Sequence, residues 1–213
     1  MDSLVSKALI MIVGPTAVGK SALMNEVCKL DPAFKRVKSF TTRQPRSNDE
    51  YNQYFYITEE QLNAHLEAGE VLTDVVYPTT GNHYGTVVQS YDGEYNLLDT
   101  LAGSVETYRL LPFHGTMTFS LTVDAQAWTE WFKSRYPEPS EERTKRLQEA
   151  KLSVDWSLKQ TDDHYWLTNQ PDNLIMTAQK LIDLATGKAK PTSEAPQSAK
   201  DMFAAIENLL SLS

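Results

Sequence analysis

The stretch Gly14-Pro15-Thr16-Ala17-Val18-Gly19-Lys20-Ser21 matches the pattern G-x-x-x-x-G-K-[ST] at every defined position. Residues 8–13, directly before it, form an apolar run that is typical of a buried strand. After it, apolar side chains recur at helical spacing at Leu23, Val27 and Leu30. A loop between such a strand and such a helix wraps its main-chain N–H groups around a polyphosphate, and the helix N-terminus adds partial positive charge. We therefore expect this segment to bind a nucleoside triphosphate.

Two side chains of this phosphate loop carry the chemistry. We expect Lys20 to reach the β- and γ-phosphates and the Ser21 hydroxyl to ligate Mg²⁺. The other predicted contacts to the triphosphate come from residues along the loop and the first helical turn: Gly14, Thr16, Ala17, Val18, Gly19 and Ala22.

Bulk composition limits the classes of protein that this chain can belong to. Its 213 residues are 41% hydrophobic and 23% charged, which is ordinary for a globular protein. No apolar run approaches the roughly 20 residues that span a bilayer, and the N-terminus shows no signal-peptide pattern. The single cysteine, Cys28, cannot form an internal disulfide. We expect a cytoplasmic protein without a membrane partner.

The charge distribution favours a small anionic ligand. The net charge of −8 and the pI of about 5.0 argue against a protein that coats nucleic acid. One short segment is nevertheless basic, with Lys35, Arg36, Lys38, Arg43 and Arg46 close together. A basic region on an acidic protein suits a compact phosphate-bearing molecule better than a long polyanion.

Strand-like and helix-like segments alternate along the chain, which predicts an α/β protein with a parallel sheet covered on both faces. Thr58 and Gln61 have the spacing of a helix-capping box, and Gly69 marks the end of that helix. The strands are expected at about 8–13, 35–41, 54–57, 70–76, 83–88, 95–99, 116–123 and 165–167. Beyond the helix at 175–184 we expect a flexible linker, 189–200, and an amphipathic helix, 201–213, that either packs on its own core or docks to a second subunit. The chain is thus a monomer or a homodimer.

Three further segments follow the phosphate loop in order: Ser39-Phe40-Thr41-Thr42-Arg43-Gln44-Pro45-Arg46, then Tyr54-Phe55-Tyr56-Ile57, then Gly81-Asn82-His83-Tyr84-Gly85-Thr86. With this succession the chain resembles the guanylate kinases, which transfer the γ-phosphoryl group of ATP to GMP. The resemblance covers about residues 8–184. It implies a three-layer P-loop kinase fold within residues 1–188, a small mixed α+β subdomain for the nucleoside monophosphate at about 39–88, and a mobile lid at about 125–147.

The resemblance also implies roles for individual residues. The monophosphate group would be held by Ser39, Arg43, Arg46, Tyr54 and Tyr84, while Thr86 would bond the purine. Arg135 and Arg146 would belong to the lid and act with Lys20 and Arg43 in catalysis. Asn169 would line the adenine side of the ATP site, and Asp99 would face both the substrate and Mg²⁺. Arginine suits phosphate because its planar fork binds two oxygens and keeps its charge.

The chain departs from the family pattern in the base pocket. Thr73 stands where these kinases usually carry a glutamate that reads guanine, and Asp74, one residue later, takes that role only if the strand bulges. Leu101 replaces a second carboxylate, and Trp131 stands at a lid position that is commonly arginine. GMP or dGMP is the expected acceptor. Two alternatives stay open: a kinase for a different or modified deoxynucleoside monophosphate, and a non-catalytic binding module, which the intact phosphate loop disfavours.

Overall fold

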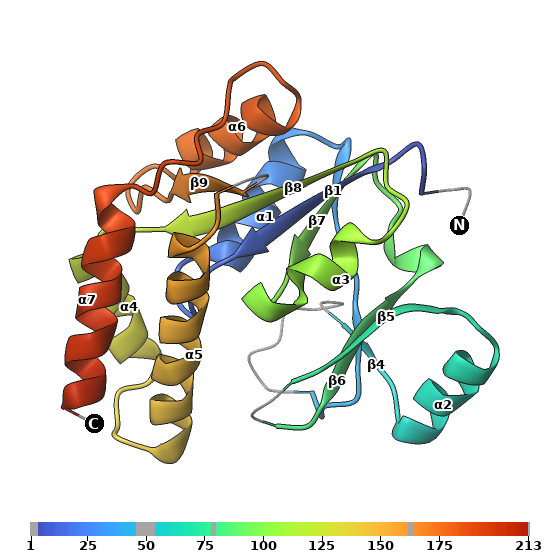
Figure 1. The fold of residues 1–213 in the computed structure, drawn as a ribbon, viewed down its shortest axis with the longest axis horizontal. Coiled ribbons are helices and arrows are strands. Elements are labelled where there is room, and N and C mark those ends of the chain that lie inside the picture. The colour runs from blue at the N-terminus through green and yellow to red at the C-terminus, as the bar shows by residue number, and fades with distance from the viewer. Residues whose placement is uncertain (1–3, 46–53, 78–79, 162–163, 213) are drawn as a thin grey trace.

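The computed structural model describes residues 4–45, 54–77, 80–161 and 164–212. A five-stranded parallel sheet in the order β2–β7–β1–β8–β9 runs through it (Figure 1). These strands are β2 (Phe34–Arg36), β7 (Tyr95–Asp99), β1 (Ala8–Val13), β8 (Gly115–Thr122) and β9 (His164–Thr168). Because β1 is the middle strand, the phosphate loop that follows it leaves the sheet at its centre, beside the end of β7.

The two faces of this sheet bury separate apolar cores. Side chains alternate along a strand, so Ile10 and Ile12 of β1 join one core, while Leu9, Met11 and Val13 join the other. The first core is covered by α1 (Lys20–Leu30), α6 (Leu174–Ala185), α4 (Ala125–Arg135) and their neighbours. The second is covered by α3 (Val105–Arg109) and Trp156 of α5 (Glu141–Leu158). The predicted three-layer α/β arrangement is therefore confirmed.

A second, mixed sheet lies apart from the first and has the strand order β4–β3–β6–β5. It consists of β4 (Phe55–Tyr56), β3 (Phe40–Thr41), β6 (His83–Val87) and β5 (Val71–Val76), with α2 (Glu59–Glu67) beside it in Figure 1. The predicted capping box begins α2: the Gln61 amide donates to Thr58 Oγ1 at 3.2 Å, and the Thr58 amide donates to Gln61 Oε1 at 2.9 Å. Gly69 follows the helix with a φ of +68°.

The expected strand at 35–41 is wrong, because the chain changes sheets within it. β2 ends at Arg36, after which the Val37 amide donates to the Leu97 carbonyl at 2.8 Å. Phe40 then pairs with Gly85 in the second sheet. Local polarity is alike on both sides of this crossing, so only tertiary pairing distinguishes the two strands. Short α3 and the 3₁₀ turns η1 (Val88–Ser90) and η2 (Ala102–Ser104) were likewise not expected from the sequence.

The last helix, α7 (Gln197–Ser211), packs against α4 and α5 of the same chain. Met202 and Ile206 are completely buried there. Of the two alternatives for this helix, the structure shows packing on its own core. The predicted linker 189–200 needs correction, since α7 already begins at Gln197 and the Thr192 carbonyl accepts a hydrogen bond from the Trp166 amide at 3.1 Å. In the described part of the chain, no helix combines the length and apolar character needed to cross a membrane.

Candidate active site

The phosphate loop turns from β1 into α1 through a backbone conformation that requires glycine. Gly19 has a φ of +95°, and a Cβ there would lie 2.5 Å from Nδ2 of Asn169. That amide donates to the Val18 carbonyl at 3.2 Å, and Asn169 is 95% buried. The structure thus places Asn169 at the phosphate loop, where its side-chain amide holds the main chain at Val18. Trp131 borders the same place, with Cζ3 3.9 Å from that Cβ position.

Lys20 is folded onto the loop that precedes it. Its Nζ donates to the carbonyls of Gly14 at 2.7 Å and Pro15 at 3.1 Å, and it lies 3.8 Å from a carboxylate oxygen of Asp99. Ser21 and Ala22 follow in the first turn of α1, where the free N–H groups and the helix dipole favour an anion. The structure therefore brings Lys20 and Asp99 together, and Ser21 follows Lys20 in the first turn of α1.

Asp99 ends β7 next to β1, and 37% of its side chain is exposed. Desolvation by the surrounding protein raises the pKa of its carboxyl, although Lys20, Arg36 and Arg135 act in the opposite direction. Carboxylate and hydroxyl oxygens, as on Asp99 and Ser21, suit Mg²⁺, which uses few protein ligands and completes its shell with water and phosphate oxygens. Among the described residues no group of three or more His, Cys, Asp or Glu side chains could hold a metal ion.

A separate cationic site lies in the second sheet. Arg43 is 92% buried, and its guanidinium carbon lies 5.1 Å from the ring centroid of Tyr54 and 5.5 Å from that of Tyr56. Its Nη1 donates to the Gln44 carbonyl at 2.9 Å. Tyr54 in turn contacts Tyr84 edge to face, with ring centroids 5.8 Å apart. Burial raises the pKa of Tyr54, so its hydroxyl remains a donor.

The structure places the other predicted monophosphate ligands as follows. Ser39 is buried, and its carbonyl accepts from the Phe55 amide at 2.9 Å, which keeps it beside Tyr54. Arg46 lies outside the described residues. Arg43, Tyr54 and Tyr84 thus form a cradle with a buried cation and two hydroxyls, and its chemistry matches a phosphate group.

The predicted base-reading residues do not stay together. Thr73 Oγ1 lies 2.7 Å from Thr86 Oγ1, and Thr86 also accepts a hydrogen bond from the Tyr91 hydroxyl at 2.9 Å. Asp74 instead points to the opposite face of β5, where both its oxygens lie within 2.9 Å of His83 Nδ1. A bulge does occur in this strand, but it falls between Val71 and Thr73, before Asp74. The structure therefore places Asp74 on the face of β5 opposite to Thr73 and Thr86.

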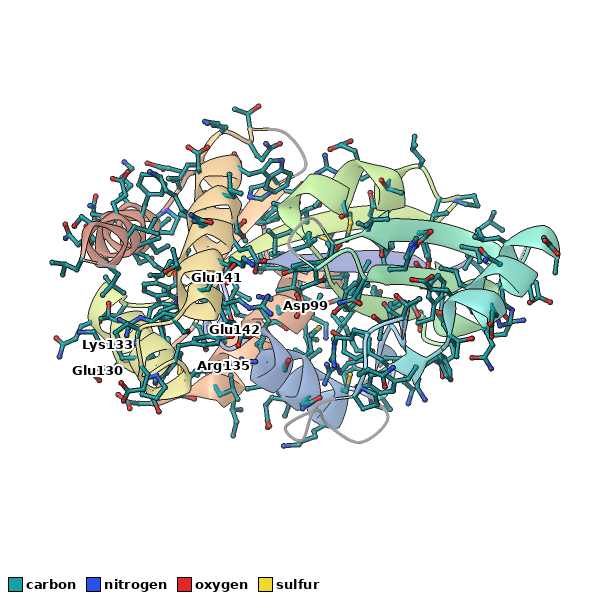
Figure 2. All side chains as sticks on the ribbon, turned by 90° about the horizontal axis from the view of Figure 1, so that it is seen from below. Asp99, Glu130, Lys133, Arg135, Glu141 and Glu142 are labelled. Carbon is teal, nitrogen blue, oxygen red and sulfur yellow. The ribbon has the colours of Figure 1, made fainter. Side chains whose placement is uncertain are left out.

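The two arginines that were predicted for the lid have different surroundings. Arg135 ends α4 and is exposed, with its guanidinium carbon 5.9 Å from the ring centroid of Tyr136. Figure 2 shows Arg135 and Glu142 on the side of their helices that faces Asp99, with Glu130 and Lys133 farther out. Arg146 of α5 is largely buried, and its Nη1 donates to Glu149 Oε2 at 2.9 Å.

Three contacts of the site were missed by the sequence analysis. Trp128 Nε1 donates to the Thr16 carbonyl at 3.0 Å, Tyr91 bonds Thr86, and Tyr77 bonds Glu149 at 3.2 Å. The first and third contacts join segments that lie far apart in the chain, and the Tyr91–Thr86 bond belongs to no sequence motif. No local pattern could have revealed them.

A phosphate-loop motif that joins the central strand of a parallel sheet to the following helix defines the class of P-loop proteins. The family model described as guanylate kinase matches residues 6–154. The chain belongs to the guanylate kinase family.

Individual relatives agree with this assignment. The guanylate kinase of Trichodesmium erythraeum is 31% identical over 149 residues, which are 67% of this chain and 78% of that protein. That of Prochlorococcus marinus is 27% identical over 184 residues, covering 84% and 96%. The crystal structure of guanylate kinase from Anaplasma phagocytophilum has a similar fold, with a TM-score of 0.58, 16% identity and 89% of each chain covered.

Proposed function

We propose that this protein transfers the γ-phosphoryl group of ATP to GMP or dGMP, giving ADP and GDP or dGDP. The observation that carries the proposal is the phosphate loop in a chain of this family, with Nζ of Lys20 3.8 Å from a carboxylate oxygen of Asp99. In the second sheet, the cluster of Arg43, Tyr54 and Tyr84 would supply the cation for the acceptor phosphate. Phosphoryl transfer needs such an arrangement, in which two nucleotides are held in line and the transferring charge is neutralised.

The donor side is assigned to the phosphate loop. Main-chain N–H groups between Gly14 and Ala22 would hold the triphosphate of ATP, with Lys20 at its β- and γ-oxygens. Ser21 and Asp99 would hold Mg²⁺, which when bound neutralises phosphate charge. Asn169, fixed at Val18, would keep the loop in shape beside the adenine.

The acceptor side is assigned to the subdomain at about 39–88. Arg43, Tyr54 and Tyr84 would bind the monophosphate, with Arg46 and Ser39 beside them, and Thr73 and Thr86 would offer hydroxyls to the base. Arg135 and Arg146, from the lid segment at about 125–147, would stabilise charge on the transferring group. No protein base is needed, because the attacking phosphate oxygen is already ionised.

Both sites come from one chain, so we propose that a monomer suffices for turnover and that a homodimer adds nothing to the site. We also propose a cytoplasmic setting, which agrees with the single cysteine.

A coupled ADP-release assay over all common ribo- and deoxyribonucleoside monophosphates tests the proposal. We expect turnover with GMP and dGMP that requires ATP and Mg²⁺ and stops on chelation with EDTA. Turnover confined to another base would refute the acceptor assignment, and binding of GMP without turnover would refute catalysis.

A further inference from the structure

A single carboxylate oxygen on α5 receives hydrogen bonds from two different parts of the molecule. Oε2 of Glu149 accepts from Nη1 of Arg146 at 2.9 Å, one helical turn away. The same oxygen accepts from the hydroxyl of Tyr77 at 3.2 Å. Tyr77 directly follows β5, so this bond connects the second sheet to the helix that carries the predicted catalytic arginine.

The Arg146–Glu149 pair differs from the surface ion pairs of this chain. Only 14% of the Arg146 side chain and 19% of the Glu149 side chain are exposed, whereas Glu106 in the similarly spaced pair with Arg109 is 72% exposed. Exposed pairs contribute little and leave their side chains mobile. A shielded, charge-assisted bond fixes the guanidinium in one orientation.

Glu149, and not Glu142, fixes the orientation of the Arg146 guanidinium. Glu142 lies 3.7 Å from Nη2, which is longer than a hydrogen bond. Burial lowers the pKa of Arg146, but Glu149 and the nearby Tyr77 and Tyr136 more than offset it, so the net pKa is raised and the group stays charged.

Tyr77 connects this pair to the phosphate cradle through a series of ring contacts. Its ring centroid lies 5.5 Å from that of Tyr84, and the Tyr84 centroid lies 5.8 Å from that of Tyr54. Tyr54 and Tyr84 are two of the residues assigned to the acceptor phosphate. A displacement of either ring when the acceptor binds would therefore be transmitted to Tyr77 through the ring contacts. From Tyr77 it would be transmitted to Glu149 through the hydrogen bond.

We propose that Glu149 is a positioning residue for Arg146, and that Tyr77 makes this positioning depend on the acceptor subdomain. The inference rests on the proposed function. Glu149 occupies one donor nitrogen of the fork and leaves the rest of the guanidinium for the transferring phosphoryl group. Tyr77 adds a second donor to the same oxygen, so the carboxylate is held from both sides when the second sheet is in the position described.

The test is a kinetic double-mutant cycle with GMP and ATP, supported by thermal unfolding of every variant. Glu149→Gln removes the charge but keeps the shape. We expect it to lower kcat on the order of 10- to 100-fold, as for a misplaced catalytic group, with the KM for ATP within about twofold. In an Arg146→Ala background the same change should have less than a twofold effect on kcat, because there is no guanidinium left to position.

Tyr77→Phe leaves the Arg146–Glu149 pair intact and removes only the connecting hydroxyl. We expect Tyr77→Phe to raise the KM for GMP by roughly three- to tenfold. In a Glu149→Gln background the same substitution should have no effect on this KM, because the effects of coupled residues are not additive. Glu207→Gln is the matched control, because it removes a 2.8 Å ion pair to Lys151, also on α5, that has no contact to Arg146. Its kcat should equal that of the wild type.

Two outcomes would overturn the inference. One is a Glu149→Gln variant with wild-type kcat; the other is an equal loss of kcat in the presence and absence of the Arg146 side chain, which indicates a purely structural role. A wild type that does not phosphorylate GMP would instead refute the proposed function. The same cycle is then run with whichever nucleoside monophosphate the wild type accepts, and the positioning role stands or falls on that result.

Discussion

The indole nitrogen of Trp128 donates a hydrogen bond to the main-chain carbonyl of Thr16 over 3.0 Å, and this bond fastens α4 to the phosphate loop. Trp128 is completely buried and stacks on Phe132, with ring centroids 5.2 Å apart. The first part of the predicted lid is thus anchored in the core.

Trp128→Phe should keep most of the packing and lose this one bond. The partly buried Thr16 carbonyl would lose its indole donor, so we expect a loss of about 0.5–1.5 kcal/mol in the free energy of unfolding and a higher KM for ATP. Urea unfolding and steady-state kinetics measure the two effects. Trp166→Phe on β9 is the control, and an equal rise in KM for ATP in that variant would contradict a local effect on the loop.

Lys20→Ala should abolish turnover while leaving the fold intact. Nζ of Lys20 donates to two loop carbonyls at 2.7 and 3.1 Å and lies 3.8 Å from Asp99. None of these contacts belongs to the apolar core, so the fold should survive their loss. Removal of its charge from the transferring phosphoryl group should lower kcat by at least roughly 100-fold, by analogy with loss of one transition-state donor. Circular dichroism of the variant checks the fold. Undiminished kcat would remove the phosphate loop from the mechanism.

Arg43→Lys should separate charge from geometry in the cradle. Lysine retains the positive charge but cannot bind two phosphate oxygens as a planar fork. We expect a KM for GMP that rises on the order of tenfold, a lower kcat, and an unchanged KM for ATP. Lys38→Ala removes a nearby cation that lies 3.9 Å over the ring of Phe55 and has no assigned role. If both variants had the same KM for GMP, Arg43 would not be the ligand.

Thr73 and Asp74 lie on opposite faces of β5, so substitutions at these neighbours should differ in kind. Thr73→Val removes the hydroxyl that meets Thr86 and should change the ratio of kcat/KM for GMP over dCMP. Asp74→Asn weakens the pair with His83 and should lower both values alike, by less than about threefold, because its ion pair is partly exposed. If the ratio of kcat/KM values changed in Asp74→Asn and not in Thr73→Val, Asp74 would be the residue that recognises the base.

His164 should make the protein sensitive to acid. Desolvation, with Arg109 adding to it, lowers the pKa of this completely buried imidazole from 6.5 to about 4, and no partner for either ring nitrogen is found among the described residues. The folded state therefore favours the neutral ring. Its contribution to stability is complete above pH 6.5 and is lost as the pH falls toward 4, with a slope of at most about 1.4 kcal/mol per pH unit.

Urea unfolding at pH 7, 5.5 and 4.5 measures this slope. His164→Phe keeps a ring between Trp156 and Trp166 and should flatten it. His65→Phe is the control, because 46% of the His65 side chain is exposed and it is paired with Glu70 at the surface. If the wild type and His164→Phe had the same slope, His164 would not be the acid-sensitive group.

The parts of the fold that the sequence predicts are those with local causes. The apolar strand at 8–13, the helix that follows the phosphate-loop motif and the Thr58 capping box depend on neighbouring residues, and the structure confirms all three elements. The division of 35–41 between two sheets depends on Leu97 and Gly85, which lie far along the chain. No periodicity within the segment could reveal it.

The site shows the same division. Arg43, Tyr54 and Tyr84 were found because a family motif carries them, and the structure brings them together. Asp74 was placed by its position in sequence, but strand alternation turns it to the other face. Glu149 and Tyr77 carry no motif and are 72 residues apart, so their contact was visible only after folding.

The packing of α7 against α4 and α5 has a consequence for how the protein is made. The apolar side chains of α4 and α5 that face α7 stay exposed until Met202 and Ile206 of α7 pack against them. A ribosome-bound chain that already contains both sheets and the helices α1 to α6 still exposes this surface to solvent and to other nascent chains. The apolar surface of α4 and α5 is therefore buried only after α7 has been synthesised, and until then it can associate with other chains.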